Sequence, residues 1–490
     1  MPPDPSEAAR ACARQTARLI EASGLELVRF GWCDTHGVVR SKALTARAAV
    51  RALQSGIGMV GTLMLKDTAD RTAYRVFDAG LAETLPGFAF ASNVQLMPNP
   101  ESFHVLPWAD KTGWVQCQAY FPDGGLVPLD TRGQLQRALA RLAGHGLGMV
   151  CGLEVEFHIY RLRDPLQGAF ADPAQAAWPG PAPEVSMIHP GYMLLSEGYL
   201  DQAEEPLRIV QRTAQALGLP LLSLEIELGP SQVEAVFEAT DALQAADTMV
   251  LFRSAVRQAL RRAGYHATFM CRPPFEAIMS SGWHLHQSLV DRSSGRNAFM
   301  RDTPAPGTTA RDAEHTLSAL GARYLAGLLH HAPGMTVLCT PTANGFGRFR
   351  PNALAPQAMV WGRDNRGAML RVLGGAGDAA TRIENRLGEP AANPYLYMAS
   401  QIHAGLSGIE AAMAAPPATE SPYAEGPDVA RIPTSLGPAL EAFAQDGAMA
   451  QGFGANFVDY YCQIKRAEQQ RWEAADDLQE FQRREYFGRI

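Results

Sequence analysis

Four segments of the chain carry ionisable residues at every second position. In "GLEVEFHIY" (152–160), Glu154 and Glu156 alternate with apolar residues. Successive side chains of a β-strand point to opposite faces, so these two carboxylates would share one face, about 7 Å apart. The other segments repeat the pattern, with Glu225 and Glu227 in "SLEIELG", with His284, His286 and Ser288 in "GWHLHQSLV", and with Arg382, Glu384 and Arg386 in "TRIENRLG". We therefore predict four strands, each apolar on one side and ionisable on the other.

This residue composition favours a divalent cation. A merely solvated sheet face is the alternative for any single strand, but such faces favour Thr, Lys and Ser over repeated Glu, His and Arg. Neighbouring carboxylates on a half-buried strand are costly unless a positive charge lies between them. Carboxylates with an occasional imidazole suit Mg²⁺ or Mn²⁺ more than a structural zinc, which would recruit cysteine.

The arginines of the same segments indicate the kind of reaction. A guanidinium matches the geometry of phosphate and carboxylate groups with paired hydrogen bonds. Arginines beside divalent cations therefore favour phosphoryl transfer or an acyl-phosphate ligase, and a metal-dependent hydrolase is the alternative. The sequence contains no Walker P-loop, so ATP would have to be held in another way.

The overall composition is that of a soluble globular protein. The 490 residues are 47% hydrophobic and 19% charged, which allows two or three domains with a large core. The net charge of −7 argues against a nucleic-acid partner, and no apolar run approaches the roughly 18 residues of a membrane span. The N-terminus lacks the apolar region of a signal peptide, and the seven scattered cysteines form no CxxC pair. We therefore expect a cytoplasmic protein with no membrane partner.

Two domains are expected to position these segments. Residues 1–126 are interpreted as a small, mainly β domain, in which a helix over 5–24 precedes two strands around a turn at 34–37. Asp130 or Thr131 can cap a helix that ends near Gly144 and opens a larger domain, residues 127–490. Pro- and Ala-rich loops interrupt this larger domain at 164–190, 302–308 and 415–434, before a helical C-terminal region.

Taken in order, the motifs resemble the glutamine synthetase family, of the bacterial long-chain kind. The match begins near residue 25 and rests on "GLEVEF", "EIELGPSQVE", "GWHLHQSL", "PTANGFGRFRP", and "WGRDNRGAMLRV" leading to "RIENRLGEPAANPYL". The resemblance implies an α+β fold, with a small β-grasp-like N-terminal domain and a large catalytic domain in which helices surround a curved antiparallel sheet. It also implies a homo-oligomer, a hexameric ring or a dodecamer, in which neighbouring subunits share each active site.

The resemblance further implies two or three divalent cations per site, Mg²⁺ or Mn²⁺, with ATP as co-substrate. Carried over by motif, the ligands of one cation would be Glu156, Glu227 and Glu234, and those of a second would be Glu154, His284 and Glu384. These cations would supply the positive charge that the first pair of carboxylates requires.

The family's reaction implies roles for further residues. ATP would phosphorylate the γ-carboxylate of L-glutamate, and an amine would then attack the γ-glutamyl phosphate. Arginines would neutralise the transferring phosphoryl group (Arg366 and Arg371) and bind the glutamate carboxylates (Arg348 and Arg386). The nucleotide-side residues would be Arg382, His286 and Ser288. Asp67, in "LKDTAD", would draw the amine into the site of an adjacent subunit.

Three departures from the family pattern concern the substrates. The loop that contacts the glutamate amino group usually contains Asn-Gly-Ser-Gly, but here it reads Met279, Ser280, Ser281, Gly282, which leaves Ser280 as its candidate contact. The usual "MPKP" reads "MCRP" at 270–273, and the flap glutamate is replaced by Leu354. Ammonium wants a carboxylate, whereas an apolar amine gains ~25 cal/mol per Å² of buried apolar area.

Leu354 therefore favours the γ-glutamylamide synthetase branch, such as γ-glutamylanilide and γ-glutamyl-alkylamide synthetases, which join L-glutamate to an organic amine. Leu354 and Met279 together favour an aromatic or alkyl amine. A glutamine synthetase that uses ammonia is the first alternative, and a polyamine or ethanolamine synthetase is another. An inactive scaffold is the alternative from a different class, and retention of the expected metal ligands and arginines disfavours it.

Overall fold

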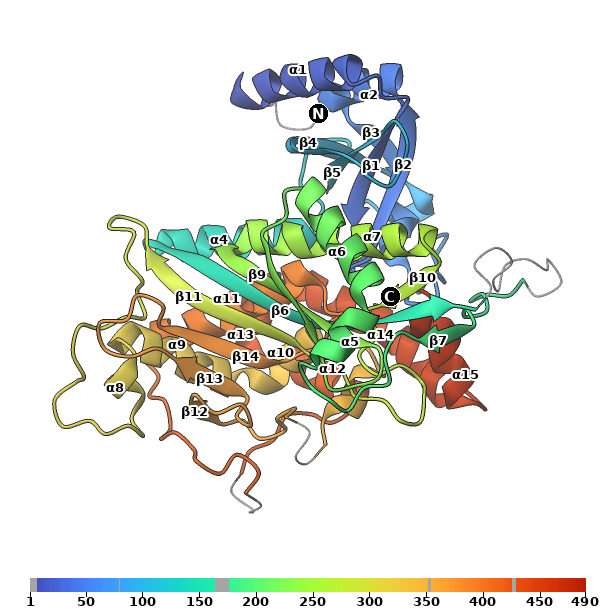
Figure 1. Ribbon diagram of the computed structural model, residues 1–490. Helices are drawn as coiled ribbons and strands as arrows, with labels where there is room; N and C mark the ends of the chain where they lie inside the picture. The colour runs from blue at the N-terminus through green and yellow to red at the C-terminus, as the bar shows by residue number, and fades with distance from the viewer. Residues whose placement is uncertain (1–6, 79, 164–175, 351–353, 425–428) are drawn as a thin grey trace.

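A computed structural model describes residues 7–490 except 79, 164–175, 351–353 and 425–428. Two β-sheets organise the described chain: a five-stranded sheet near the N-terminus and a nine-stranded sheet in the remainder. In Figure 1 the smaller sheet stands above the larger one, and the helices α4 (Thr131–Gly144) and α7 (Ala242–Arg262) lie between them. The division of the chain into two domains at residue 126 stays a prediction.

The smaller sheet has the strand order β2-β1-β5-β4-β3. Its strands are β1 (Leu27–Cys33), β2 (Val39–Thr45), β3 (Ile57–Val60), β4 (Asn93–Val105) and β5 (Thr112–Tyr120). The central pair β1 and β5 is parallel, and the other pairs are antiparallel. Helices α1 (Glu7–Ala22) and α2 (Ala46–Ser55) cover it (Figure 1) and bury Ile20 and Leu53. The predicted helix and the hairpin that follows it are confirmed.

The larger sheet is built around one long strand, β6 (Leu147–Leu162), in the order β12-β13-β14-β11-β6-β9-β8. Its other strands are β7 (Val185–Met187), β8 (Leu221–Ile226), β9 (Gln232–Asp241), β10 (Tyr265–Thr268), β11 (Trp283–Asp291), β12 (Trp361–Arg363), β13 (Leu370–Leu373) and β14 (Arg382–Gly388). The short strands β7 and β10 pair with β6. All pairs are antiparallel except β12 with β13.

Helices cover the apolar side of this sheet. Besides α4 and α7 they include α9 (Ala319–His330), α10 (Ala332–Cys339) and α11 (Pro394–Glu410), which is buried along nearly its whole length. The remaining helices are α3 (Leu81–Thr84), α5 (Glu197–Gln202), α6 (Glu204–Ala216), α8 (Ala313–Thr316), α12 (Leu436–Gln445), α13 (Gly447–Phe453), α14 (Ala455–Glu473) and α15 (Leu478–Gln482). Single turns occur at η1 (Gly61–Leu65), η2 (Ala89–Ala91), η4 (Gly345–Arg348) and η5 (Arg483–Phe487). The Asp130 carboxylate accepts a hydrogen bond from the Gly133 N–H and caps α4, as predicted.

The predicted alternation of the long strand is present. Leu153, Val155 and Phe157 are buried in the core, whereas Glu154 and Glu156 lie on the opposite face and are half-buried. Burying one face of β6 against helices while the other stays polar is what a half-covered antiparallel sheet requires. The carboxylates are thus presented on the side of the sheet that the helices leave open.

One of the four predicted strands is shorter than expected. The segment "SLEIELG" was expected to be extended through Leu228, but β8 ends at Ile226 and leaves Glu227 just beyond the strand. Leu228 is 37% exposed, so the apolar side of this segment is not buried to its end. The reason is local: β8 is the edge strand, and the chain turns at Gly229 and Pro230 before entering β9.

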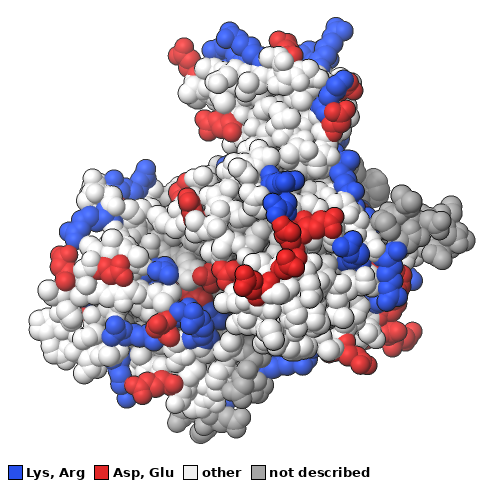
Figure 2. All heavy atoms as spheres, viewed as in Figure 1, with Lys and Arg blue, Asp and Glu red and all other residues white. Residues whose placement is uncertain are grey.

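The expected α+β class, with a small β-grasp-like N-terminal part and a large part with a curled sheet surrounded by helices, is confirmed. On the face shown in Figure 2, a band of acidic side chains crosses the middle of the molecule, and elsewhere acidic and basic side chains are interspersed. Within the residues that the structure describes, no helix combines the length and the apolar character needed to cross a bilayer.

Candidate active site

The register of the larger sheet places its ionisable side chains beside one another. Three cross-strand pairs result: Glu154 with His284, His286 with Glu384, and Glu156 with Glu234. The pairs run across four adjacent strands, β14, β11, β6 and β9. Because directly opposed residues have Cβ atoms only about 5 Å apart, one patch of the sheet collects carboxylates and imidazoles from four strands.

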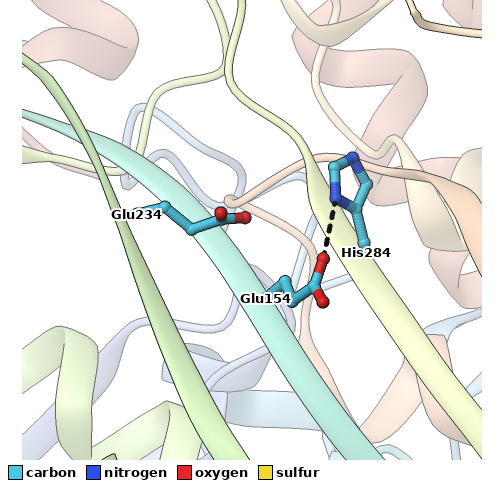
Figure 3. A group of neighbouring side chains, drawn as sticks. All are labelled: Glu154, Glu234 and His284. Carbon is cyan, nitrogen blue, oxygen red and sulfur yellow. Dashed lines mark ion pairs between the residues drawn. The ribbon is translucent and has the colours of Figure 1, made fainter. Parts of the chain in front are cut away.

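Glu154, Glu234 and His284 form a first group of candidate metal ligands (Figure 3). Each residue offers one ligand atom, and these atoms lie within 4.8 Å of one another. The dashed line in Figure 3 joins Glu154 Oε2 and His284 Nδ1, which are 3.5 Å apart. The three side chains project from β6, β9 and β11 toward one another, so one cation could contact all of them.

A second group shares Glu154 with the first. Its other members are His286 and Glu384, again with one ligand atom each within 4.8 Å of the others. His286 Nε2 lies 2.9 Å from Glu154 Oε1, and His284 Nδ1 lies 3.9 Å from Glu384 Oε1. Both histidines therefore reach the space between Glu154 and Glu384. The assignment of His284 to this cation stays a prediction.

Glu156 and Glu227 are oriented by neutral donors. Glu156 Oε2 accepts hydrogen bonds from the Gln232 amide at 2.9 Å and from the Gly282 N–H at 3.0 Å. Glu227 Oε2 accepts one from the Leu228 N–H at 3.1 Å. Such donors fix the positions of the carboxylates but leave their negative charge uncancelled.

The carboxylates of this patch repel one another. Burial, followed by the charges of Glu156, Glu227 and Glu154, raises the pKa of Glu234 to about 10. Burial and the charge of Glu227 raise the pKa of Glu156 to about 7, and burial raises that of Glu227. Glu154 differs: burial opposes its ionisation, but hydrogen bonds to His284 and His286 hold its pKa well below the usual range. The charges of Arg348 and Arg386 oppose these shifts at Glu156, and that of Arg386 does so at Glu227, but the pKa values stay raised. Full ionisation of Glu156, Glu227 and Glu234 together therefore requires further positive charge.

The donor set fits a divalent cation. Burial and the nearby charge of Arg386 lower the pKa of His284 to about 4, so its imidazole is neutral near pH 7 and free to act as a ligand. Carboxylate oxygens dominate the rest of the set, as Mg²⁺ and Mn²⁺ prefer. The observation that carries the fit is the mutual repulsion of the carboxylates, which a bound cation would relieve.

Two arginines pair with Glu384, the most deeply buried of the candidate ligand carboxylates. Glu384 is fully buried; its Oε2 lies 3.0 Å from Arg371 Nη1, and its Oε1 accepts a hydrogen bond from Arg386. Arg371 also binds Asp364, with an Nε–Oδ1 distance of 3.0 Å. The buried Arg386 Nε has no hydrogen-bond partner among the described residues, which leaves a donor for a substrate.

Arg348 enters the site from the turn η4. It is buried, and its Nη1 donates to the main-chain oxygens of Leu387 and Gly388 at 3.3 and 2.9 Å. A Cβ atom at Gly282 would lie 2.5 Å from Arg348 Nη2 and 3.1 Å from His284 Nε2. A side chain at position 282 would therefore collide with the Arg348 guanidinium and crowd His284.

The three expected nucleotide-side residues line one cavity. His286, Ser288 and Arg382 form part of the wall of a cavity of about 340 Å³ beside Glu154. Arg382 Nε lies 3.1 Å from His286 Nδ1. The cavity thus joins the candidate metal ligands to an arginine that could bind a phosphate group.

Other predicted residues are not brought to this patch within one chain. Asp67 is buried in its own loop, where its Oδ1 accepts the N–H groups of Ala69 and Arg71, and its Oδ2 pairs with Arg471. Arg366 is exposed and lines a separate cavity of about 460 Å³ with Asp364.

The substrate-side predictions fall on two loops. Ser280 receives a hydrogen bond from Arg272 Nη1 at 3.3 Å, and its neighbour Met279 lies against Gly229. Leu354 is 54% exposed and has a positive φ of 52°. Residues 351–353, which precede it, lie outside the described residues.

Two residues of the site were not singled out from the sequence. Gln232 donates to Glu156 and also to Ser281 Oγ at 3.0 Å, and Asp364 orients Arg371. Gln232 could have been found by extending the two-residue alternation backward from Glu234. Asp364 gives no such signal, because the motif "DNR" that contains it points to Arg366 as the functional residue.

Comparisons with known proteins agree on one family. A family model described as "Glutamine synthetase, catalytic domain" matches residues 128–484. The gamma-glutamylanilide synthase of an Acinetobacter species is 37% identical, over 96% of this chain and 94% of its own length. The glutamine synthetase of Halobacterium salinarum is 29% identical, over 93% and 92%. A solved complex of GmaS with ADP has a TM-score of 0.74 and 28% identity, covering 96% of this chain and 98% of its own.

Proposed function

This chain belongs to the glutamine synthetase family, and we propose that it is an ATP-dependent ligase that joins the γ-carboxylate of L-glutamate to an organic amine. The observation that carries the proposal is the patch of mutually repelling carboxylates beside buried arginines. Cations and guanidinium groups together stabilise the charge of a transferring phosphoryl group. The similarity to a gamma-glutamylanilide synthase over 96% of the chain supports an amine other than ammonia.

Two or three Mg²⁺ or Mn²⁺ ions would be held by Glu154, Glu156, Glu227, Glu234, His284 and Glu384. Bound there, the cations would neutralise the phosphate oxygens of ATP and of the γ-glutamyl phosphate. Gln232 would keep Glu156 in place while the cations exchange, because its amide contacts the Glu156 carboxylate at 2.9 Å.

Different arginines would bind the anionic groups of glutamate and of ATP. Arg348 and Arg386 would bind the glutamate carboxylates, since both are buried beside the candidate ligands and Arg386 retains an unused donor. Arg371 and Arg366 would neutralise the transferring phosphoryl group. Arg366 is exposed, so this role requires the loop that carries it to close over the nucleotide. Arg382, His286 and Ser288 would contact the nucleotide from the adjoining cavity.

Leu354 would shape the entrance for the amine. A half-exposed leucine provides apolar surface and no charge, so it favours an aromatic or alkyl amine over ammonium. Ser280, in the loop next to Met279, would contact the glutamate. Glutamine synthesis from ammonia is the second candidate, because a relative named glutamine synthetase matches over 93% of the chain.

A homo-oligomeric ring, a hexamer or a dodecamer, would complete each site with Asp67 from an adjacent subunit. The observation that supports a shared site is the position of Asp67. Its carboxylate contacts Ala69 and Arg471 and none of the candidate metal ligands of its own chain that the structure describes. We place the enzyme in the cytoplasm, because the seven cysteines are free.

The test is a phosphate-release assay with purified protein, Mg²⁺, ATP and L-glutamate across aniline, isopropylamine, ethanolamine, putrescine and ammonia, with products identified by mass spectrometry. We expect a γ-glutamylamide of aniline or of an alkylamine, formed far faster than glutamine. If ammonia is preferred, the enzyme is a glutamine synthetase with an unusual entrance. Absence of any product with every amine would contradict the ligase proposal.

A further inference from the structure

Four arginines of α7 line a cavity outside the candidate active site. Arg253, Arg257 and Arg261 follow at intervals of four residues, which places them on one face of the helix. Together with Arg262 they line a cavity of about 580 Å³. Its other walls come from the hairpin residues 36–39, from β10 and from the C-terminal segment. In Figure 1 the C-terminus lies near α7 and β10, below the N-terminal sheet.

The cavity is positively charged. Of the described residues that line it, none is Asp or Glu. Arg29 adds a further guanidinium nearby, because it donates at 2.7 Å to Gln258 Oε1, and Gln258 lines the cavity. Ile490 also lines the cavity. Its main-chain oxygen accepts hydrogen bonds from the Thr268 hydroxyl at 3.0 Å and from the Phe269 N–H at 3.1 Å, and the protein thus satisfies this oxygen without the arginines. In a chain of net charge −7, this concentration of positive charge is local.

Hydrogen bonds within the chain satisfy only some of the N–H donors of these arginines. Arg253 donates to two main-chain oxygens of the loop before α11 and to that of Gly37, but its buried Nε, on a side chain 6% exposed, has no partner among the described residues. Arg257 donates to two main-chain oxygens of the C-terminal segment. The guanidinium groups of Arg261 and Arg262 make no ion pair or hydrogen bond to the part of the chain that the structure describes.

Burial penalises the positive charge of two of these arginines. It lowers the pKa of Arg253 to about 10, although the nearby Asp34 and Glu389 oppose the shift. Burial, with the charges of Arg253 and Arg489, lowers the pKa of Arg257 to about 10. Holding these side chains positive in such surroundings is costly, and an anion between them would reduce that cost.

We propose that this cavity binds a small dianion, a dicarboxylate or a phosphate monoester, whose charged groups pair with the arginine face of α7. The volume lies within the range of about 300–1,000 Å³ usual for small-molecule sites. Guanidinium groups recognise carboxylate and phosphate with paired hydrogen bonds. Binding here does not depend on the proposed ligase activity.

The position of the cavity gives the anion a route to the N-terminal loop. A second cavity of about 380 Å³ shares His36, Arg257 and Ile490 with the first and is also lined by Asp67 and Thr68. A bound dianion would therefore lie in the cavity that adjoins the one lined by Asp67.

Isothermal titration of the full chain at fixed ionic strength tests the proposal, with succinate, glutarate and inorganic phosphate as separate probes. We expect saturable 1:1 binding of at least one probe, and the probe bound identifies the anionic group. Arg261→Gln should weaken it by about tenfold, the usual cost of a lost charged hydrogen bond, and Arg261→Glu should abolish it. Arg212→Gln on α6 is the matched control, because Arg212 is an exposed helical arginine outside the cavity, and it should leave the affinity unchanged.

Binding at the active site is excluded by a further variant. Arg348→Met removes a guanidinium of the active site and should leave the dianion affinity within twofold of that of the unsubstituted protein. Circular dichroism checks that each variant is folded. If Arg261→Glu does not fold, the affinity of Arg261→Gln by itself tests the proposal. The proposal is overturned if no probe binds, if both Arg261 variants bind as tightly as Arg212→Gln, or if Arg348→Met abolishes binding.

Discussion

Two clusters of like charge lie in this molecule, and they differ in where their residues come from. The carboxylate patch gathers Glu156, Glu227 and Glu234 from strands β6 and β9 and from the end of β8. The arginine cavity takes Arg253 and Arg257 from a single helix, α7. In both, the pKa values are displaced toward the neutral form because burial and like charges penalise ionisation.

The two clusters also differ in the charges that surround them. The carboxylate patch is flanked by groups of opposite sign, since Arg371 and Arg386 pair with the buried Glu384 at its edge. The arginine cavity has no carboxylate side chain among its described lining residues. We infer that the carboxylate patch binds cations beside arginines that bind anionic substrates, whereas the arginine cavity binds only an anion.

Removing the Glu384 carboxylate, which lies between the other carboxylates and the arginines, should have the greatest effect on activity. Glu384→Gln takes away a candidate cation ligand and the partner of both arginines. We expect a loss of at least about 10³-fold in kcat, because catalysis here depends on placed charge. Glu410→Gln, which removes a surface carboxylate paired with Arg141, should change kcat less than twofold. Equal activity of Glu384→Gln and the unsubstituted enzyme would contradict the account.

Glu389 is a buried carboxylate outside both clusters, and it predicts a pH dependence of stability. It is fully buried, accepts hydrogen bonds from Thr342 N–H and Oγ1 at 2.7 and 2.9 Å, and burial raises its pKa to about 7. Unfolded glutamate titrates near about 4.3. The folded protein therefore binds more protons between these values, and its stability should fall as pH rises through them, by about 3 kcal/mol from this group.

Urea unfolding at pH 5 and pH 8 measures this fall. Glu389→Gln should reduce the difference in unfolding free energy between the two pH values by most of that amount. Glu441→Gln, an exposed glutamate on α12, should leave the difference as it is. An identical pH dependence in Glu389→Gln and in the unsubstituted protein would show that Glu389 ionises normally.

Removal of one repelling carboxylate should stabilise the cation-free protein. In EDTA at pH 8 we expect Glu234→Gln to raise the free energy of unfolding by about 1–3 kcal/mol, because glutamine removes the cost of keeping a carboxyl group protonated in the folded state at this pH. The same variant should lose most of the stabilisation that Mn²⁺ gives the unsubstituted protein, which is about 2.7 kcal/mol at a concentration 100 times Kd. Thermal unfolding with and without Mn²⁺ measures both effects. Stabilisation by Mn²⁺ that survives in Glu234→Gln would remove Glu234 from the ligand set.

The smallest effect concerns the amine. Leu354→Glu should raise kcat/KM for ammonia and lower it for aniline, each by about tenfold, because a carboxylate attracts ammonium and an apolar contact is lost. Leu478→Glu places the same substitution at a 44% exposed leucine on α15 and should change neither value. An unchanged ratio in Leu354→Glu would separate Leu354 from amine choice.

The sequence predicted the carboxylate patch better than the arginine cavity, for a physical reason. A two-residue alternation places Glu154 and Glu156 on one face of a strand wherever the strand lies, and the structure has them so. It does not say which strands pair, so the opposition of Glu154 and His284 could not be read from spacing alone. The family motifs supplied that assignment.

The sequence did not predict the arginine cavity, because only one of its walls comes from a single continuous segment. The four-residue spacing of the arginines on α7 can be read from the sequence, but the hairpin and the C-terminal segment that close the cavity arrive from the two ends of the chain. The same long-range packing decides that Asp67 pairs with Arg471. No local pattern encodes such contacts.

In the proposed ligase reaction a γ-glutamyl phosphate forms and is then attacked by an amine. L-Glutamate labelled with oxygen-18 in the γ-carboxylate, incubated with ATP, Mg²⁺ and the preferred amine, tests this through the isotope content of the released phosphate. We expect one oxygen-18 atom in each phosphate, because the oxygen that bridges carbon and phosphorus leaves with phosphorus. Unlabelled phosphate would show that water attacks ATP directly, and would contradict the ligase mechanism.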